Sequence, residues 1–91
     1  MDDQSINRVK VVIHGVEYTI RGSASERHIH EVARLVDQRM SEIAASSAYM
    51  DERRVAVLTA VNLADELHRL RQEYEELLAM LDERTRGETS T

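Results

Sequence analysis

The fold is decided by residues 63–81, with the sequence LADELHRLRQEYEELLAML. Apolar side chains recur there in alternating steps of four and three residues, at Leu63, Leu67, Leu70, Tyr74, Leu77 and Leu81. This spacing is the heptad repeat of a coiled coil, in which Leu67, Tyr74 and Leu81 occupy position a and Leu63, Leu70 and Leu77 occupy position d. We call these six residues the leucine seam. Ala56 and Ala60 continue the repeat towards the N-terminus.

The seam belongs to a long helix that nothing in the sequence interrupts. No Gly or Pro occurs from Asp51 to Glu83, a run of 33 residues, and one helix of that length spans ~50 Å at 1.5 Å per residue. We expect Asp51 or a neighbour to cap its start. Residues 55–64 are apolar except for Thr59 and Asn62, which predicts burial on most sides. Asn62 then needs a hydrogen-bond partner, either backbone of this or another chain or a ligand.

The N-terminal part alternates as a strand does. Apolar residues fall at every second position in two runs, first at Val9, Val11 and Ile13 and then at Val16, Tyr18 and Ile20. Each run predicts a half-buried strand. Gly15 lies between the runs and is suited to the positive φ of a tight turn, so a β-hairpin is expected.

A second amphipathic pattern follows the hairpin. Its start is marked by the sequence Ser23-Ala24-Ser25-Glu26, which fits a capping box with Ser23 as the N-cap and Glu26 as its partner. Ser25 is the rival N-cap. One face then carries Ile29, Val32, Ala33, Val36, Met40, Ile43 and Ala44. These spacings follow the 3.6-residue period of a helix that packs on the hairpin. The helix is expected to fade over residues 44–47, with a short link to about residue 50.

Composition narrows the class of protein. The 91 residues include no Cys, Trp, Phe or Pro, and the net charge is −5 with a pI near 5.3. An acidic balance argues against a nucleic-acid-binding protein. Residues 1–50 contain 7 acidic and 6 basic residues, whereas residues 51–83 contain 9 acidic and 4 basic ones. The acidic excess therefore belongs to the long helix, and the N-terminal half is nearly neutral.

No catalytic or metal-binding pattern is present. The chain lacks a Gly-rich phosphate loop, and His28 and His30 are two residues apart, so they diverge on a helix and do not share a metal ion. We expect no enzyme, no cofactor and no metal. The sequence also has no apolar N-terminal signal and no stretch of ~18 apolar residues, which predicts a soluble intracellular protein without membrane contact.

Together the patterns predict an α+β chain: a β-hairpin and an amphipathic helix form a head, and a long C-terminal helix forms an intermolecular coiled coil. We expect a flexible N-terminus over residues 1–7, the head over 8–64, the coiled-coil extension over 65–83 and a flexible tail over 84–91. A small head cannot cover the seam, so self-association is expected. A dimer is the simplest form, and tetramers stay open because Leu78 and Met80 widen the seam. Glu66 at g and Arg71 at e suit a parallel two-stranded coil.

Three motifs resemble a known family. Residues 9–20 read V-x-V-x-I-x-G-x-x-Y-x-I, residues 36–40 read V-D-x-x-M, and residues 54–67 read RVAVLTAVNLADEL. The last run is similar to the second-helix motif of the ZapA family of bacterial cell-division proteins. The resemblance implies a non-enzymatic, cytoplasmic protein that acts at the mid-cell division site. It also implies binding to FtsZ, the tubulin-like division GTPase, and bundling of FtsZ filaments by dimers or antiparallel tetramers, which stabilises the Z-ring.

The resemblance places partner-binding charges on the head. The candidates in this chain are Arg21, Arg27, Glu31, Arg34, Arg39, Arg53 and Arg54. The candidates for oligomerisation are Ala56, Ala60 and the leucine seam.

Two alternatives remain at the level of sequence. A ribbon-helix-helix-like DNA-binding dimer also combines a strand with two helices, and Arg8, Lys10 and Val12 would then face a DNA groove. The second predicted strand, the long second helix and the acidic charge count against it. A generic coiled-coil adaptor is the other alternative.

Overall fold

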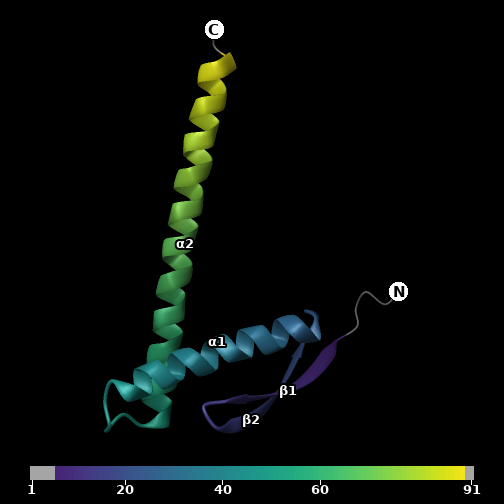
Figure 1. Ribbon diagram of the computed structural model, residues 1–91, viewed down its shortest axis with the longest axis vertical. Coiled ribbons are helices and arrows are strands. Elements are labelled where there is room, and N and C mark those ends of the chain that lie inside the picture. The colour runs from purple at the N-terminus through teal and green to yellow at the C-terminus, as the bar shows by residue number, and fades with distance from the viewer. Residues whose placement is uncertain (1–5, 90–91) are drawn as a thin grey trace. The chain divides into compact units, whose positions relative to one another are not determined.

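The computed structural model describes residues 6–89, which form four elements along the chain (Figure 1). They are β1 (Asn7–Ile13), β2 (Val16–Gly22), α1 (Glu26–Ala45) and α2 (Glu52–Thr89). The predicted α+β order of a hairpin followed by two helices, the second one long, is confirmed. The chain comprises two compact units, residues 1–59 and residues 60–91. The first holds the hairpin, α1 and the start of α2, and the second holds the rest of α2.

The hairpin has the predicted register and faces. Val9 pairs with Ile20, Val11 with Tyr18, and Ile13 with Val16, so the six apolar residues share one face of the sheet. Both turn residues have positive φ, 80° at Gly15 as predicted and 50° at His14. Positive φ at both central residues is the signature of a type I′ turn, whose twist matches that of the strands.

α1 covers the apolar face of β1 (Figure 1). The buried cluster consists of Val9 and Val11 from the strand and Ile29 and Ala33 from the helix. The predicted apolar stripe of α1 is buried at Ile29, Ala33 and Met40 but not at Val32, which stays 43% exposed. A sheet of two strands is too narrow to cover the whole stripe.

Polar side chains fix the helix ends. Ser25 is the N-cap of α1, and its hydroxyl accepts a hydrogen bond from the His28 N–H at 3.1 Å. The predicted capping box with Ser23 as the N-cap is therefore wrong, and the rival Ser25 is correct. Asp51 caps α2 as expected, since its Oδ1 accepts the Arg54 N–H at 2.8 Å.

The apolar segment over residues 55–64 differs from the prediction. Only Val55 and Thr59 are buried, whereas Val57, Leu58 and Val61 are exposed, and so is Asn62. The expected burial on most sides is therefore wrong for the single chain. Residues 55–59 belong to the first unit, and the rest of that unit covers only one side of them.

The two chain ends also differ from the expected boundaries. β1 begins at Asn7, and α2 continues to Thr89 instead of ending near Glu83. Gly87 does not stop the helix, since one Gly inside a helix costs only about 1 kcal/mol. The Thr85 hydroxyl donates to the Leu81 carbonyl at 2.9 Å, in keeping with a helical turn there. The remaining parts of the predicted flexible ends, residues 1–5 and 90–91, lie outside the described residues.

Candidate functional site

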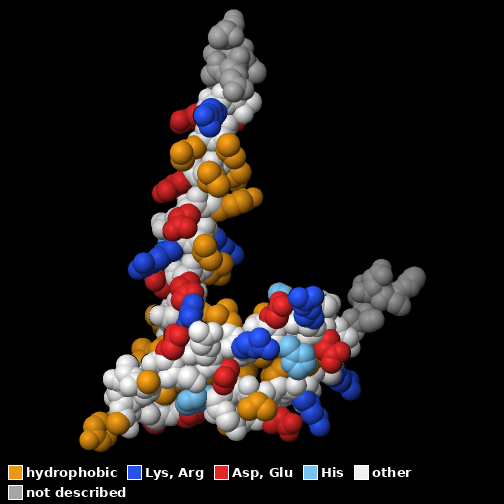
Figure 2. All heavy atoms as spheres, in the orientation of Figure 1, with side chains coloured by type: hydrophobic (Ala, Val, Ile, Leu, Met, Phe, Trp, Pro, Cys, Tyr) orange, Lys and Arg blue, Asp and Glu red, His pale blue; other side chains and the backbone are white. Residues whose placement is uncertain are grey.

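The leucine seam is open along the second unit. Leu63 is half-buried, and the other five residues are between 51% and 63% exposed: Leu67, Leu70, Tyr74, Leu77 and Leu81. Leu78 and Met80 beside them are exposed as well. Figure 2 shows hydrophobic side chains gathered along one side of this part of α2. A continuous apolar row of this kind on a surface marks an interaction site.

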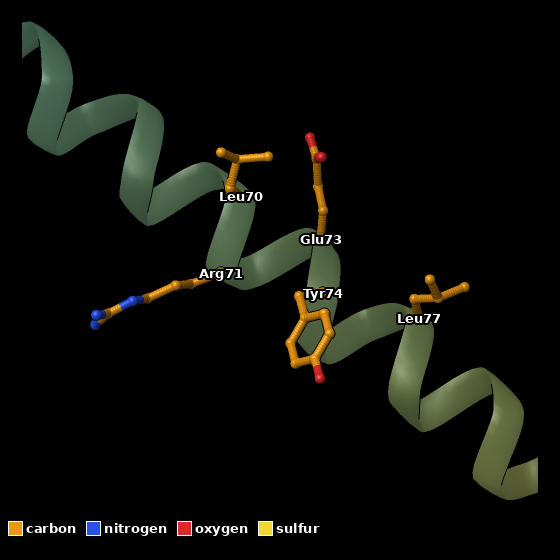
Figure 3. A pocket seen from close by; sticks show the side chains of 5 residues that line it. All are labelled: Leu70, Arg71, Glu73, Tyr74 and Leu77. Carbon is orange, nitrogen blue, oxygen red and sulfur yellow. The ribbon is translucent and has the colours of Figure 1, made fainter. Parts of the chain in front are cut away.

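Side chains in the middle of the seam form a shallow hollow. It is lined by Leu70, Tyr74 and Leu77, with Arg71 and Glu73 at its border. In Figure 3 Leu70 and Leu77 project in the same direction on either side of Tyr74, while Arg71 and Glu73 extend away from each other. Apolar side chains at a and d with charges at e and g are the arrangement that receives a second helix.

The two alanines proposed for oligomerisation lie in different units. Ala56 is exposed and lines an apolar groove of the first unit together with Ile13, Tyr18 and Met40. Ala60 is exposed at the start of the second unit. Both are free to accept another chain, since neither is buried in its own unit.

Three of the seven partner-binding candidates are already engaged in ion pairs on α1. Arg27 Nε lies 3.4 Å from Glu31 Oε2, and both side chains are exposed. Arg39 Nη1 lies 3.7 Å from Glu42 Oε1, and only 24% of the Arg39 side chain is exposed. A partner of these residues would have to share or replace those pairs.

The other four candidates carry unpaired charge. Arg21, Arg34, Arg53 and Arg54 are exposed and make no ion pair with another residue among 6–85. Arg53 and Arg54 line a groove with Asp51 and Val57 at the start of α2. These four guanidinium groups are therefore available to an acidic partner.

Two further cations outside the seven candidates, Arg8 and Lys10, are exposed on β1. Arg8 lies directly opposite Arg21 in the hairpin register, an arrangement of like charges that destabilises a strand pair. Lys10 and Arg34 line the same groove between β1 and α1. Counting the register outward from the two-residue turn at His14 and Gly15 predicts the Arg8–Arg21 pair, so the sequence did contain this signal.

The described residues form no cluster of side chains that could bind a metal ion. No group of three or more His, Cys, Asp or Glu side chains converges within residues 6–85. In the same range, none of the helices combines the length and the apolar character needed to cross a membrane.

These features define a small α+β protein with an open coiled-coil repeat and a head that carries unpaired cations. The profile of the family described as "Cell division protein ZapA" matches residues 9–89. The chain belongs to the ZapA family of cell-division proteins.

Individual relatives agree over nearly the whole length. The ZapA protein of Geobacillus thermodenitrificans (strain NG80-2) is 43% identical, with 97% of each chain covered. That of Bacillus pumilus (strain SAFR-032) is 38% identical over 92% of this chain and 99% of its own. The solved structure of a ZapA mutant dimer from Geobacillus stearothermophilus superposes with a TM-score of 0.72 at 41% identity. The superposition covers 90% of this chain and 95% of the Geobacillus stearothermophilus chain.

Proposed function

We propose that this chain binds FtsZ filaments and cross-links them as a dimer or tetramer, which stabilises the Z-ring at mid-cell. The observation that carries the proposal is the open leucine seam on a chain of the ZapA family. The protein acts in the cytoplasm as a non-enzymatic binding protein and uses no cofactor.

Self-association is the first step of the proposal. A relative of 41% identity is described as a dimer. The seam side chains are about half exposed, and burying the exposed half gains about 1 kcal/mol per side chain. Six residues on each of two helices then contribute about 10 kcal/mol, which is similar to the 4–15 kcal/mol cost of association. The seam alone gives a marginal dimer, so the exposed apolar side chains of the head, among them Val57 and Val61, are proposed to contribute as well.

Cross-linking follows from having several heads. A filament presents the same binding surface repeatedly, so a two-headed protein gains avidity even when each head binds weakly. We place the filament contact on the head cations. Arg21, Arg34, Arg53 and Arg54 are favoured, since Arg27, Glu31 and Arg39 are already in ion pairs.

The family membership argues against the ribbon-helix-helix alternative, as does the pairing of β1 with β2 of the same chain.

Co-sedimentation with FtsZ polymerised by GTP, together with light scattering for bundles, tests the proposal. We expect the wild type to pellet with the filaments and to raise the scattering. A variant with Leu67, Leu70 and Leu77 replaced by Ser should still bind but raise the scattering much less, because its heads are no longer joined. A matched control replaces Gln72, Glu75 and Glu76, outside the seam on α2, by Ser. Wild-type protein that stays in the supernatant would refute the proposal.

A further inference from the structure

The outer edge of β1 has no partner strand among the described residues. Within residues 6–89 the sheet consists of β1 and β2 alone. The two-residue turn makes Ile13 and Val16 a hydrogen-bonded pair, and such pairs alternate with non-hydrogen-bonded ones along an antiparallel ladder. The backbone N–H and C=O groups of Arg8, Lys10 and Val12 therefore point away from β2, towards the open edge.

A groove runs along this edge. It is lined by Lys10, Val11 and Val12 of β1 and by His30, Ala33, Arg34 and Asp37 of α1. No residue of β2 contributes to it, so it lies on the side of β1 that faces away from β2. Helix α1 borders the edge without covering it, and Val12 remains 61% exposed.

The charge around the groove is predominantly positive. Lys10 and Arg34 line it, and Arg8 lies two residues before Lys10 on the same strand. None of the three makes an ion pair within residues 6–85. The carboxylate of Asp37 is used internally, because its Oδ1 accepts the His14 N–H at 2.6 Å.

Charged residues on an edge strand also prevent two sheets from pairing with each other. That role accounts for Arg8 and Lys10, which repel the same edge of a second copy. It does not account for Arg34, which comes from the neighbouring helix and faces the same groove. Three cations from two elements around a free backbone edge are complementary to an acidic strand.

We propose that an extended acidic segment of a partner protein docks in this groove as a third strand beside β1. Its backbone pairs with Arg8, Lys10 and Val12, as in other cases of strand addition to a sheet edge. Because side chains alternate along a strand, every second residue of the segment lies beside Arg8 and Lys10 and is acidic. The residues between them face Ala33 and are small or apolar, while Arg34 adds its positive charge to the same groove. This docking site extends the proposed function to a particular surface of the head. It rests on the proposed function only for the identity of the partner protein.

A synthetic peptide tests the site directly. The probe is a hexapeptide of alternating Glu and Val with blocked ends, titrated into the full-length protein while backbone amide chemical shifts are recorded. We expect saturable shifts at Arg8, Lys10, Val12 and the α1 residues of the groove, with weak affinity of about 0.1–1 mM for so short a strand. Amides of the outer edge of β2, such as Thr19, should stay unchanged.

Two peptide controls separate charge from edge pairing. A Gln-for-Glu peptide should bind about tenfold more weakly, because it lacks the charge-assisted contacts. A peptide in which every backbone amide is N-methylated keeps its charge but has no N–H to donate to a strand edge, so it should not bind. Equal binding by either control would overturn the corresponding half of the proposal, and no shifts at all would overturn the whole of it.

Variants of the protein provide matched controls. Val12→Pro removes an outward N–H on β1, and Thr19→Pro removes one on the outer edge of β2, a kind of position where Pro is tolerated. Only the first should abolish peptide binding, provided that circular dichroism shows both variants folded. Lys10→Glu combined with Arg34→Glu gives the same test without a Pro.

Two outcomes would overturn the inference. If Val12→Pro dissociates the oligomer, the edge serves another copy of the chain, and if duplex DNA produces the same shifts at lower concentration, the edge serves DNA.

The same variants separate this inference from the proposed function. Wild-type protein that pellets with FtsZ while the peptide fails to bind would refute only the strand-docking site. Peptide binding without co-sedimentation would refute only FtsZ as the partner.

Discussion

His14 Nδ1 lies 2.7 Å from Glu52 Oε2 and 2.9 Å from Oε1, which joins the hairpin turn to the first turn of α2 across 38 positions of sequence. A carboxylate only accepts hydrogen bonds, so the imidazole donates from Nδ1. The His14 N–H donates in addition to Asp37 Oδ1 on α1. One turn residue thus ties together the three parts of the head, which helps to explain a non-Gly residue at a φ of 50°.

The contact between His14 and Glu52 should stabilise the head modestly. The side chains are 25% and 55% exposed, and pairs of that exposure contribute about 0.5–1 kcal/mol. Asn also tolerates positive φ, so His14→Asn removes the contact without straining the turn. We expect His14→Asn and Glu52→Gln each to lower the melting temperature by a few degrees.

A double-mutant cycle isolates that contact. The coupling free energy between His14→Asn and Glu52→Gln, measured by urea unfolding, should be about 0.5–1 kcal/mol. Glu17→Gln on β2 serves as the control, since Glu17 is exposed and makes no ion pair with a described residue. It should show no coupling to His14→Asn, and zero coupling for Glu52→Gln would mean that the contact adds nothing to stability.

Thr59 is a second place where stability should change. Its side chain is 3% exposed, and its Oγ1 has no hydrogen-bond partner among the described residues. A buried hydroxyl without a partner costs roughly 1–3 kcal/mol. Thr59→Val keeps the shape and removes the hydroxyl, so it should raise the free energy of unfolding by about 1 kcal/mol.

The control for Thr59 is Thr19→Val on the exposed surface of β2, which should change stability by less than ~0.5 kcal/mol. If Thr59→Val instead destabilises the protein, the hydroxyl is satisfied in the self-associated form. Repeating the melts over a range of protein concentrations would then reveal a weaker oligomer.

How far sequence predicts this protein depends on what each residue contacts. Val9, Val11 and Ile20 are placed correctly by alternation alone, because their partners lie in a hairpin whose register is set by the turn. Val57 and Val61 were expected to be buried and are exposed in the single chain. Periodicity reports which side chains are apolar, but it does not report whether the covering surface lies in the same chain.

The candidate binding residues show a similar division. Arg27 and Glu31 looked available in the sequence, yet they pair with each other. The sequence suggests a role for Arg8 and Lys10 only in the DNA-binding alternative. In the structure the strand register places Arg8 opposite Arg21, and Lys10 lines the same groove as Arg34. Charge alone does not distinguish a satisfied residue from a free one, since that depends on side-chain geometry and on long-range strand pairing.

The leucine seam should control the oligomeric state. Leu70 and Leu77 are 62% and 53% exposed in the single chain, so they have much apolar area to bury against another helix. Replacing both by Ala removes several buried methyl and methylene groups from each helix and should weaken self-association about 100-fold or more. Analytical ultracentrifugation over a concentration series measures the dissociation constant.

The matched control for the seam is Gln72→Ala with Glu76→Ala, which lie outside the seam on the same helix and should leave the dissociation constant within about threefold of the wild type. A further variant sharpens the test. Tyr74→Ile places at this a position a β-branched residue of the type that two-stranded coils prefer there and should tighten association. An unchanged oligomer in the Leu70 and Leu77 variant would show that the head alone holds the chains together.

Binding to FtsZ filaments should depend on the unpaired head cations rather than on the paired ones. Arg34→Glu and Arg53→Glu each place a negative charge where we propose an acidic partner, so co-sedimentation should fall severalfold and more steeply at low salt, where screening is weak. Exchanging Arg27→Glu with Glu31→Arg preserves that ion pair with its polarity reversed and should leave binding unchanged. If the exchange abolishes co-sedimentation while Arg34→Glu does not, the filament contact lies on the other flank of α1. Raising the salt concentration should weaken co-sedimentation of the wild type in either case, because a contact made by charges loses affinity as the Debye length shortens.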